Sequence, residues 1–339
     1  MISIDFRSDT VTLPTAEMKN AMMTAHLGDD VYGDDQSINA LEDYVAKRLG
    51  LESALFTPSG TSANLVGIMA HCQRGDEYIV GGTAHTYKYE GGGAAVLGSI
   101  QPQPIEFESD GTIDLEKVEK KIKPDNFHFA RTTLLCLENT QDGKVLPLEY
   151  LQEAYKLCQK YTLSLHLDGA RICNAAVALG IELREITQYF NSVSLCLSKG
   201  LGAPVGSLFC GTKELVDKAR RWRKVTGGGM RQAGFLAEAG LYALENHFDR
   251  LSIDHQNAQI LATSLQEIPG CEIIEKPQTN MVFVRFDERF NELENYLASK
   301  NILISQDTYT RFVTHLGITT EDISTLQREI LRFIEQSHT

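Results

Sequence analysis

A single lysine interrupts a long uncharged stretch of the sequence. Lys199 is the only charged residue between Ile186 and Thr212, and it lies between an apolar run at 193–197 and a glycine-rich segment at 200–204. At the end of a buried strand a lysine loses hydration, which lowers its pKa toward the neutral amine that attacks a carbonyl group and forms a Schiff base. Taken alone, Lys199 fits a structural role better, as a side chain that reaches solvent or pairs with a carboxylate.

An aspartate precedes this lysine by about one strand–helix–strand unit. Residues 163–168 alternate apolar and polar side chains, so Asp168 ends a predicted strand, and residues 169–171 follow at a predicted helix start. The carboxylate could simply cap that helix. In a parallel sheet, however, Asp168 and Lys199 would lie at the same edge. An acid and an amine at one edge suit a pyridine cofactor, because the acid keeps the ring nitrogen protonated while the amine holds the aldehyde.

A phosphate-binding turn would complete such a site. Residues 56–64 are typical of a strand end, a tight turn and a helix start, in which Ser59, Gly60 and Thr61 offer backbone amides and hydroxyl groups. Helix N-termini attract anions through their free amides and the helix dipole. The turn lacks the P-loop pattern, and most turns of this kind only cap a helix. Its significance comes from its combination with the lysine and the aspartate.

Two histidines are weaker candidates. His85 follows a predicted strand at 78–80, where it could stack on a planar cofactor and exchange protons, although a single histidine usually has no such role. His128, in the segment 126–129, lies on no predicted strand. The residues around His128 therefore favour a structural role for it.

Two charged clusters lack a pattern that defines a ligand. The segment 28–35, which includes Tyr32, does not have EF-hand spacing, so its acids are interpreted as turn and cap residues and no metal site is predicted. The glycine triplets 91–93 and 227–229 lack the dinucleotide-binding pattern. Basic residues surround the second triplet and either form a solvated helix face or bind an anion across a subunit boundary. This basic island consists of Arg220, Arg221, Arg223, Lys224 and Arg231.

The elements that would position these residues alternate between short apolar runs and longer helical segments. Strands are predicted near 54–57, 78–80, 94–97, 132–137, 163–167, 194–197 and 207–210. This alternation predicts an α/β domain with a mainly parallel sheet, in which ligands bind beyond the carboxyl ends of the strands. After residue 212 the pattern becomes helical. We predict a large domain over residues 1–250 and a smaller C-terminal α+β domain over residues 251–339.

Net charge and cysteine content restrict the kinds of binding partner and the cellular compartment that we expect for this protein. The 339 residues carry a formal net charge of −13, which argues against nucleic acid and anionic membrane surfaces as main partners. The first ten residues include Asp5, Arg7 and Asp9 and no apolar segment, so no secretory signal is predicted. No uncharged apolar run is long enough to span a membrane. Seven cysteines, an odd number without a C-x-x-C pair, indicate reduced thiols in a cytoplasmic protein.

Eight short segments stand in a characteristic order along the chain. They are residues 8–12, 28–35, 58–61, 137–140, 166–171, 198–200, 227–232 and 311–315. Few of them are diagnostic alone. Together they closely resemble the low-specificity L-threonine aldolases, which are fold-type I pyridoxal-phosphate enzymes. The resemblance extends over nearly the whole chain and implies the fold of the PLP-dependent transferases, with pyridoxal 5′-phosphate as cofactor.

The resemblance assigns roles to most candidate residues. Lys199 would bind the cofactor covalently, Asp168 would pair with the pyridine nitrogen, and His85 would stack on the ring. The other cofactor contacts would be Ser59, Gly60, Thr61, Arg171 and, from a neighbouring subunit, Lys224 and Arg231. The substrate contacts would be Ser8, Tyr32, His85, His128, Arg171 and Arg311. The family is typically tetrameric, a dimer of dimers with active sites at the dimer interface.

The implied activity is retro-aldol cleavage of L-threonine, L-allo-threonine and related β-hydroxy amino acids to glycine and an aldehyde. The catalytic residues would be Lys199, Asp168, His85 and His128. His85, or a water held by His85 and His128, would remove the β-hydroxyl proton. A β-eliminating lyase or an aminotransferase of the same fold type is the nearest alternative, because the same lysine, aspartate and phosphate turn serve them. A cofactor-free binding protein on the same scaffold is a more distant alternative.

Overall fold

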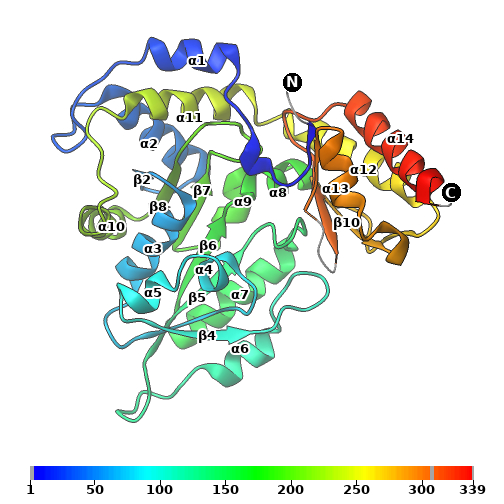
Figure 1. Ribbon diagram of the computed structural model, residues 1–339. Helices are drawn as coiled ribbons and strands as arrows, with labels where there is room; N and C mark the ends of the chain where they lie inside the picture. The colour runs from blue at the N-terminus through cyan, green and yellow to red at the C-terminus, as the bar shows by residue number, and fades with distance from the viewer. Residues whose placement is uncertain (1–3, 306–308, 338–339) are drawn as a thin grey trace.

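The computed structural model describes residues 4–305 and 309–337, and a seven-stranded sheet forms its larger part (Figure 1). In the order in which they pair, its strands are β2 (Ser53–Thr57), β8 (Ser207–Gly211), β7 (Ser192–Cys196), β6 (Ser164–Gly169), β5 (Thr132–Glu138), β3 (Glu77–Gly81) and β4 (Gln101–Ile105). β8 runs antiparallel to both of its neighbours, and the other neighbouring pairs are parallel. The predicted mainly parallel sheet is confirmed.

Helices pack on both faces of the sheet because the buried side chains alternate along its strands. In β5, Leu135 belongs to a core cluster shared with α2 (Gln36–Leu49) and α11 (Gly234–Asn246), whereas Leu134 belongs to a cluster shared with α3 (Gly60–His71). The remaining helices of this unit are α1 (Ala16–Met23), α4 (His85–Lys88), α5 (Gly93–Val96), α6 (Leu115–Lys121), α7 (Leu148–Tyr161), α8 (Ile172–Leu179), α9 (Leu183–Thr187) and α10 (Lys213–Val225).

One predicted strand is wrong. Residues 94–97, expected as a strand, fall on helix α5, and the strand missing from the prediction is β4. β4 contains Pro102 and Pro104, residues that normally argue against a strand. It pairs with β3 alone, at the edge of the sheet. An edge strand tolerates proline because one side of its backbone forms no ladder hydrogen bonds.

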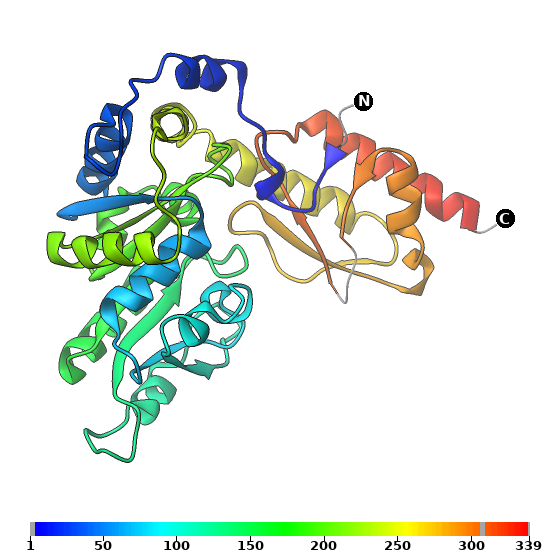
Figure 2. The same ribbon diagram turned by 60° about the vertical axis from the view of Figure 1, so that its left-hand side comes forward.

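A smaller unit lies to one side of the sheet domain (Figure 2). Its three antiparallel strands pair in the order β12 (Thr310–Val313), β10 (Met281–Phe286) and β9 (Cys271–Ile273). Its helices are α12 (Leu251–Gln266), α13 (Leu293–Ser299) and α14 (Thr320–Ser337). These elements share a hydrophobic core of their own. The boundary near residue 250 stays a prediction.

The first described residues pack with the small unit. β1 (Ile4–Asp5) pairs in parallel with β11 (Ile302–Leu303), and Phe6 is fully buried in the core of the small unit. The chain then crosses to the edge of the large sheet, where the Thr12 hydroxyl donates a hydrogen bond to the carbonyl of Lys199 at 2.9 Å. This N-terminal segment therefore contacts both units. The predicted division assigned it to the large domain.

Six of the seven cysteines are buried as free thiols, which agrees with the expectation. These are Cys72, Cys136, Cys158, Cys173, Cys196 and Cys210. Burial raises the pKa of Cys72, Cys158 and Cys173 to about 12, which keeps these side chains in the unreactive thiol form. Among the helices of residues 4–305 and 309–337, none combines the length and the apolar character needed to cross a bilayer.

Candidate active site

Four ionisable side chains meet at the carboxyl edge of the sheet. Glu138 is the last residue of β5 and lies in register with Asp168 of β6. His85 begins α4, shortly after β3, and Lys199 follows β7. Because parallel strands end at the same edge, residues far apart in sequence become neighbours. Glu138, His85 and Lys199 line a cleft of about 610 Å³, and the buried Asp168 carboxylate approaches the His85 imidazole within 4.8 Å.

The cleft takes its walls from three parts of the chain. Most of its lining comes from loops that follow strands of the large sheet, while the N-terminal segment and the small unit supply the rest. The lining residues are Ser8, Thr10, Thr83, His85, Lys88, Tyr89, Glu138, Gln141, Asp142, Arg171, Lys199, Met281 and Arg311. The cleft therefore opens between the sheet domain and the small unit.

Asp168 is held as a buried hydrogen-bond acceptor. It is 2% exposed, and Asn64 Nδ2 donates to its Oδ2 at 2.8 Å. The backbone amide of Ala170 donates to Oδ1 at 3.0 Å, and the Ser194 hydroxyl does so at 3.4 Å. Donors around a buried carboxylate compensate for its lost hydration. Asp168 is therefore fixed in position, as required of a group that must face one atom of a ligand.

Lys199 has a fixed backbone and a side chain that is available in the cleft. Its carbonyl oxygen accepts hydrogen bonds from the Thr12 hydroxyl at 2.9 Å and from the Gly202 amide at 2.8 Å. Within the described part of the chain, no carboxylate forms an ion pair with its Nζ. The structural role in which Lys199 only pairs with an acid therefore receives no support, and the amine is free to bind a ligand.

His85 shares a hydrogen bond with a buried glutamate. Its Nδ1 lies 2.8 Å from Glu90 Oε1, which also accepts a hydrogen bond from Asn64 Nδ2 at 2.9 Å. The hydrogen bond to Glu90 raises the pKa of His85, and burial raises the pKa of Glu90. With its proton on Nδ1, His85 presents Nε2 to the cleft as an acceptor.

Glu138 is a functional candidate that the sequence reasoning missed. Burial, together with the nearby Asp168 carboxylate, raises the pKa of Glu138 to about 8. Its Oε2 accepts a hydrogen bond from the backbone amide of His85 at 2.7 Å. At neutral pH Glu138 is therefore largely protonated, so it can give or take a proton in the cleft. The signal was present, since Glu138 ends a strand just as Asp168 does.

Arg171 is already engaged by a buried carboxylate. Its Nε and Nη2 donate to Asp9 at 2.8 and 2.6 Å. Burial opposes the charge of Asp9, yet Arg171 and Lys199 together hold its pKa well below the usual range. One edge of the guanidinium is thus occupied, and the remaining nitrogen, Nη1, is the part that can contact a ligand.

Arg311 enters the cleft from the small unit. It lies on β12, and its Nη2 donates a hydrogen bond to the backbone carbonyl of Arg7 at 3.3 Å. Ser8, the N-cap of the short helix at 9–11, lines the same wall. Arg311 therefore offers a guanidinium that is not committed to a carboxylate of the described chain, next to a hydroxyl group. Such a pair suits recognition of a substrate carboxylate.

The turn before α3 has the features of an anion site. Ser59 caps the helix, its Oγ accepting a hydrogen bond from the amide of Ser62 at 3.1 Å. The amides of Gly60 and Thr61 stand in the first turn, where a helix offers no internal acceptor. Ser207 Oγ is buried without a partner among the described residues, 3.7 Å from the place of a Cβ on Gly60. This donor set fits a bound phosphate group.

The basic island contacts the acidic segment 28–35. The buried Arg223 donates to the Asp30 carboxylate at 2.5 Å, and Arg231 pairs with Asp29 at 3.0 Å. The glycine triplet between these two arginines packs against the start of α3. Acidic segment, basic island and anion turn therefore form one connected region within a single chain.

Among the expected site residues, Tyr32, Lys224 and Arg231 lie outside the cleft of the single chain. Tyr32 is 77% exposed in the loop before α2. Lys224 is exposed and lines a separate surface cavity with residues of the acidic segment. Arg231 is half exposed and bound to Asp29. Within one chain, none of the three contacts the cleft around Lys199.

His128 lies at the opposite edge of the sheet from the cleft. It is exposed on the loop before β5, and its neighbours Asn126 and Phe129 line a cavity with Thr132 and Thr162, close to the amino ends of β5 and β6. A residue that precedes a parallel strand stands at the amino edge, whereas the cleft stands at the carboxyl edge. Within one chain the expected contact of His128 with the cleft does not form.

A mainly parallel sheet with a lysine and an aspartate at its carboxyl edge, beside a glycine turn that starts a helix, defines the fold-type I class of pyridoxal-phosphate enzymes. The chain belongs to the beta-eliminating lyase family, which matches residues 5–289, and within it to the low-specificity L-threonine aldolases. It is 56% identical over 322 residues to the low specificity L-threonine aldolase of Escherichia coli (strain K12), covering 95% of this chain and 96% of that one.

Two further comparisons agree with this placement. The low-specificity L-threonine aldolase 1 of Arabidopsis thaliana is 40% identical, with 100% of this chain and 99% of the relative covered. Among solved structures, a threonine aldolase of Leishmania major superposes with a TM-score of 0.82 over 98% of this chain and 99% of that one, at 20% identity. The structural likeness at this identity concerns the fold alone. The predicted family and fold class are confirmed.

Proposed function

We propose that this chain cleaves L-threonine and related L-β-hydroxy-α-amino acids between Cα and Cβ, giving glycine and an aldehyde, with pyridoxal 5′-phosphate as cofactor. The observation that carries the proposal is the cleft in which Lys199 and His85 lie beside the buried Asp168. The names of the relatives, low-specificity L-threonine aldolases that match nearly the whole chain, support the same reaction.

The residues of the cleft and of the turn before α3 fit this cofactor. Lys199 would bind its aldehyde carbon, Asp168 its ring nitrogen, and His85 one face of its ring. Its phosphate group would be held by Ser59, Gly60 and Thr61, next to the unpaired Ser207 hydroxyl. When bound, the cofactor supplies a conjugated ring that accepts the electron pair released by bond cleavage at Cα.

The arginines of the cleft orient the substrate. Arg311, with Ser8 and the free nitrogen of Arg171, would hold the α-carboxylate. Because the two guanidiniums come from different units of the chain, they can fix the carboxylate from two sides. A carboxylate held in this way would fix the orientation of the substrate and thereby select the Cα–Cβ bond for cleavage.

His85 is the best placed base for the β-hydroxyl proton. Its Nδ1 is directed at Glu90, so Nε2 is the atom that accepts the proton. Glu138, in hydrogen-bond contact with the backbone of His85, is a second group that carries a proton in the same cleft. Release of the aldehyde then leaves Cα to be protonated, which requires a donor that the protonated His85 or Glu138 supplies.

Assembly would bring the remaining residues to the site. We propose a homotetramer, a dimer of dimers, in which Tyr32, His128, Lys224 and Arg231 act across a subunit boundary. The loop of His128 exposes Phe127 at 91% and Phe129 at 50%, which supports burial of this loop by a second copy. We further propose a cytoplasmic location, supported by the free thiols.

Replacement of the lysine tests the proposal. Lys199→Ala should remove the visible absorbance of the bound cofactor and nearly all turnover. Incubation of the unmodified protein with L-threonine or L-allo-threonine should yield glycine and acetaldehyde. A fully active Lys199→Ala variant would overturn the assignment, and formation of a keto acid with ammonia would instead indicate a β-eliminating lyase.

A further inference from the structure

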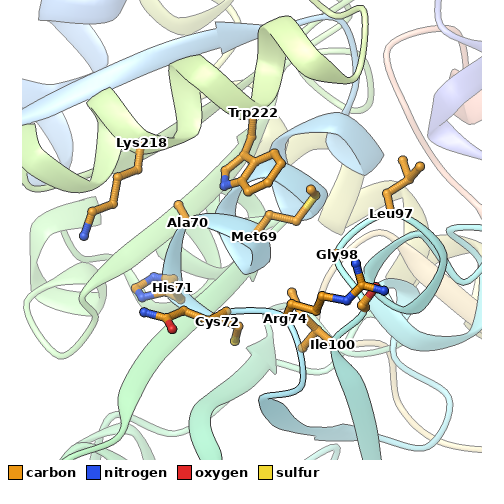
Figure 3. A pocket seen from close by; sticks show the side chains of 12 residues that line it. Met69, Ala70, His71, Cys72, Arg74, Leu97, Gly98, Ile100, Lys218 and Trp222 are labelled. Carbon is orange, nitrogen blue, oxygen red and sulfur yellow. The ribbon is translucent and has the colours of Figure 1, made fainter.

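A chain of buried polar side chains runs from a surface cavity to Asp168. His71 stands on the wall of this cavity, which has a volume of about 480 Å³ (Figure 3). His71 Nε2 lies 2.7 Å from Ser192 Oγ, which lies 2.8 Å from His166 Nδ1. His166 Nε2 lies 3.3 Å from Asn64 Oδ1, and Asn64 Nδ2 lies 2.8 Å from Asp168 Oδ2. The three middle residues are essentially inaccessible to solvent.

The orientation of Asn64 fixes the inner half of this chain. Its Nδ2 lies 2.8 Å from Asp168 Oδ2 and 2.9 Å from Glu90 Oε1. An ionised carboxylate only accepts hydrogen bonds, so the amide NH₂ group must face Asp168 and the amide oxygen must face His166. Because that oxygen also only accepts, His166 donates from Nε2.

The outer half then has one consistent arrangement. Burial lowers the pKa of His166 to about 4, so its ring is neutral and carries its single proton on Nε2. His166 Nδ1 therefore accepts from the Ser192 hydroxyl, whose oxygen accepts in turn from His71 Nε2. Every hydrogen bond in the chain consequently donates in the direction of Asp168.

We propose that His166 and Ser192 are positioning residues that act through Asn64 to orient the Asp168 carboxylate. The inference rests on the proposed function, in which this carboxylate faces the cofactor ring nitrogen. Hydrogen bonds in series polarise one another, and donors directed at a carboxylate stabilise its negative charge.

The series of hydrogen bonds also links three elements of the fold around the proposed site. Asn64 lies on α3, His166 on β6 and Ser192 on β7. The amino end of α3 carries the anion turn, so the same helix that contacts Asp168 would hold the cofactor phosphate. The hydrogen bond from Asn64 therefore connects the helix that carries the anion turn with the carboxylate of Asp168.

A cofactor that lacks the ring nitrogen separates this role from a general structural one. The apoprotein would be titrated with pyridoxal 5′-phosphate and with its 1-deaza analogue, in which a C–H group replaces the nitrogen and cannot use Asp168. The unmodified protein should bind pyridoxal phosphate more tightly. His166→Leu should reduce this preference about tenfold, because the donor that acts on Asn64 is lost. His166→Gln, whose amide can donate at the same place, should retain most of the preference.

A second buried histidine provides the matched control. His255 on α12 is also buried, and its Nε2 lies 3.2 Å from Asn174 Nδ2, but it is not part of the chain to Asp168. His255→Leu should reduce the melting temperature of the apoprotein, as His166→Leu should, while the preference between the two cofactors stays at the level of the unmodified protein.

Several outcomes would overturn the inference. One is an unchanged preference in His166→Leu, and another is an equal loss of affinity for both cofactors. If His166→Leu does not fold, Ser192→Ala, which removes a single oxygen atom, should lower the preference about threefold, and no change would count against the inference. An unmodified protein that binds pyridoxal phosphate no better than the analogue would overturn it too, whereas failure to bind either cofactor would refute the proposed function itself.

Discussion

The surroundings of Glu138 and His85 raise the pKa of both side chains. Burial raises the pKa of Glu138, and the hydrogen bond to Glu90 raises that of His85. The two groups are in contact, since the His85 amide donates to Glu138 at 2.7 Å. Each shift has a different cause, so each can be changed by a different substitution.

The charge of Glu90 should control the pH dependence of catalysis. His85 must be deprotonated at Nε2 to act as base, so kcat/KM should fall as the pH falls through its pKa. Glu90→Gln replaces the carboxylate with a neutral amide and removes the interaction that raises this pKa. We expect the acid limb of kcat/KM for L-threonine to move to lower pH. An acid limb that stays in place would contradict the role of His85.

Glu138 should make the apoprotein less stable at alkaline pH. Its pKa in the folded chain, about 8, lies above the ordinary value of 4.5, so stability is lost as the pH rises between these two values. Glu138→Gln lacks this loss, and its melting temperature should exceed that of the unmodified protein by roughly 5 °C at pH 9. The two proteins should converge near pH 4. Calorimetry across this range checks the prediction, with the exposed Glu116→Gln as a control that should show no such difference.

Individual site residues could be predicted from the sequence where they come shortly after an apolar, strand-like run. Lys199, Asp168 and His85 were found because each follows such a run. The same rule applies to Glu138, which ends β5 and was not among the predicted site residues. Glu90 could not be found in this way, since it reaches His85 through the turn after α4 and no local pattern indicates that contact.

At the scale of elements, apolar periodicity predicts buried strands but not the edge at which a loop residue stands. His128 precedes β5 and therefore stands at the amino edge, far from the residues that follow strands. The strand β4 was not predicted because its prolines normally argue against a strand. They are tolerated here because β4 lies at the edge of the sheet and pairs with β3 alone. The missed strand and the position of His128 within one chain both depend on how the strands are arranged in the sheet, which is set by long-range packing and not by local sequence.

The contact between the basic island and the start of α3 can be tested by adding a side chain at Gly228. A Cβ on Gly228 would lie 3.2 Å from Arg223 Cγ, 3.3 Å from Ser62 Oγ and 3.4 Å from Pro58 Cδ, which leaves no room for a larger side chain. Gly228→Val should displace the anion turn and weaken binding of pyridoxal 5′-phosphate about tenfold, with little effect on pyridoxal, which has no phosphate.

Its neighbour supplies the control for this experiment. A Cβ on Gly229 would have only the end of Lys224 nearby, at 3.9 Å. Gly229→Val should therefore leave the affinity for pyridoxal 5′-phosphate nearly unchanged. Equal effects of the two substitutions, or an equal loss of affinity for pyridoxal in Gly228→Val, would show that the turn does not depend on this contact.

At the scale of the whole molecule, the cleft is completed by parts that belong to different units. Arg171 comes from the sheet domain and Arg311 from the small unit, and the N-terminal segment lies between them. Other expected contacts, Lys224 and Arg231, lie on an outer surface of the same chain. A complete site therefore requires both the correct placement of two units and, in our proposal, a second copy.

A mixture of two inactive variants tests whether subunits share a site. Lys199→Ala removes the amine of one chain, and Arg231→Ala removes a cation that a neighbouring chain would lend. In a mixed dimer, one site then contains both changes and the other contains neither. After dissociation and reassembly, the mixture should recover about a quarter of the unmodified activity. If both variants assemble but no activity returns, the sites are not shared in this way.

The pairing of Ile4 with Ile302 has a consequence for synthesis of the protein. The first strand leaves the ribosome about 300 residues before its partner exists, and it must stay unpaired during that time. Asp9 and Thr12 follow this strand closely in the sequence. They form hydrogen bonds with Arg171 and Lys199, respectively. A nascent chain that already contains the entire large sheet is therefore still catalytically immature, and premature termination near its end should be as damaging as a substitution in the cleft.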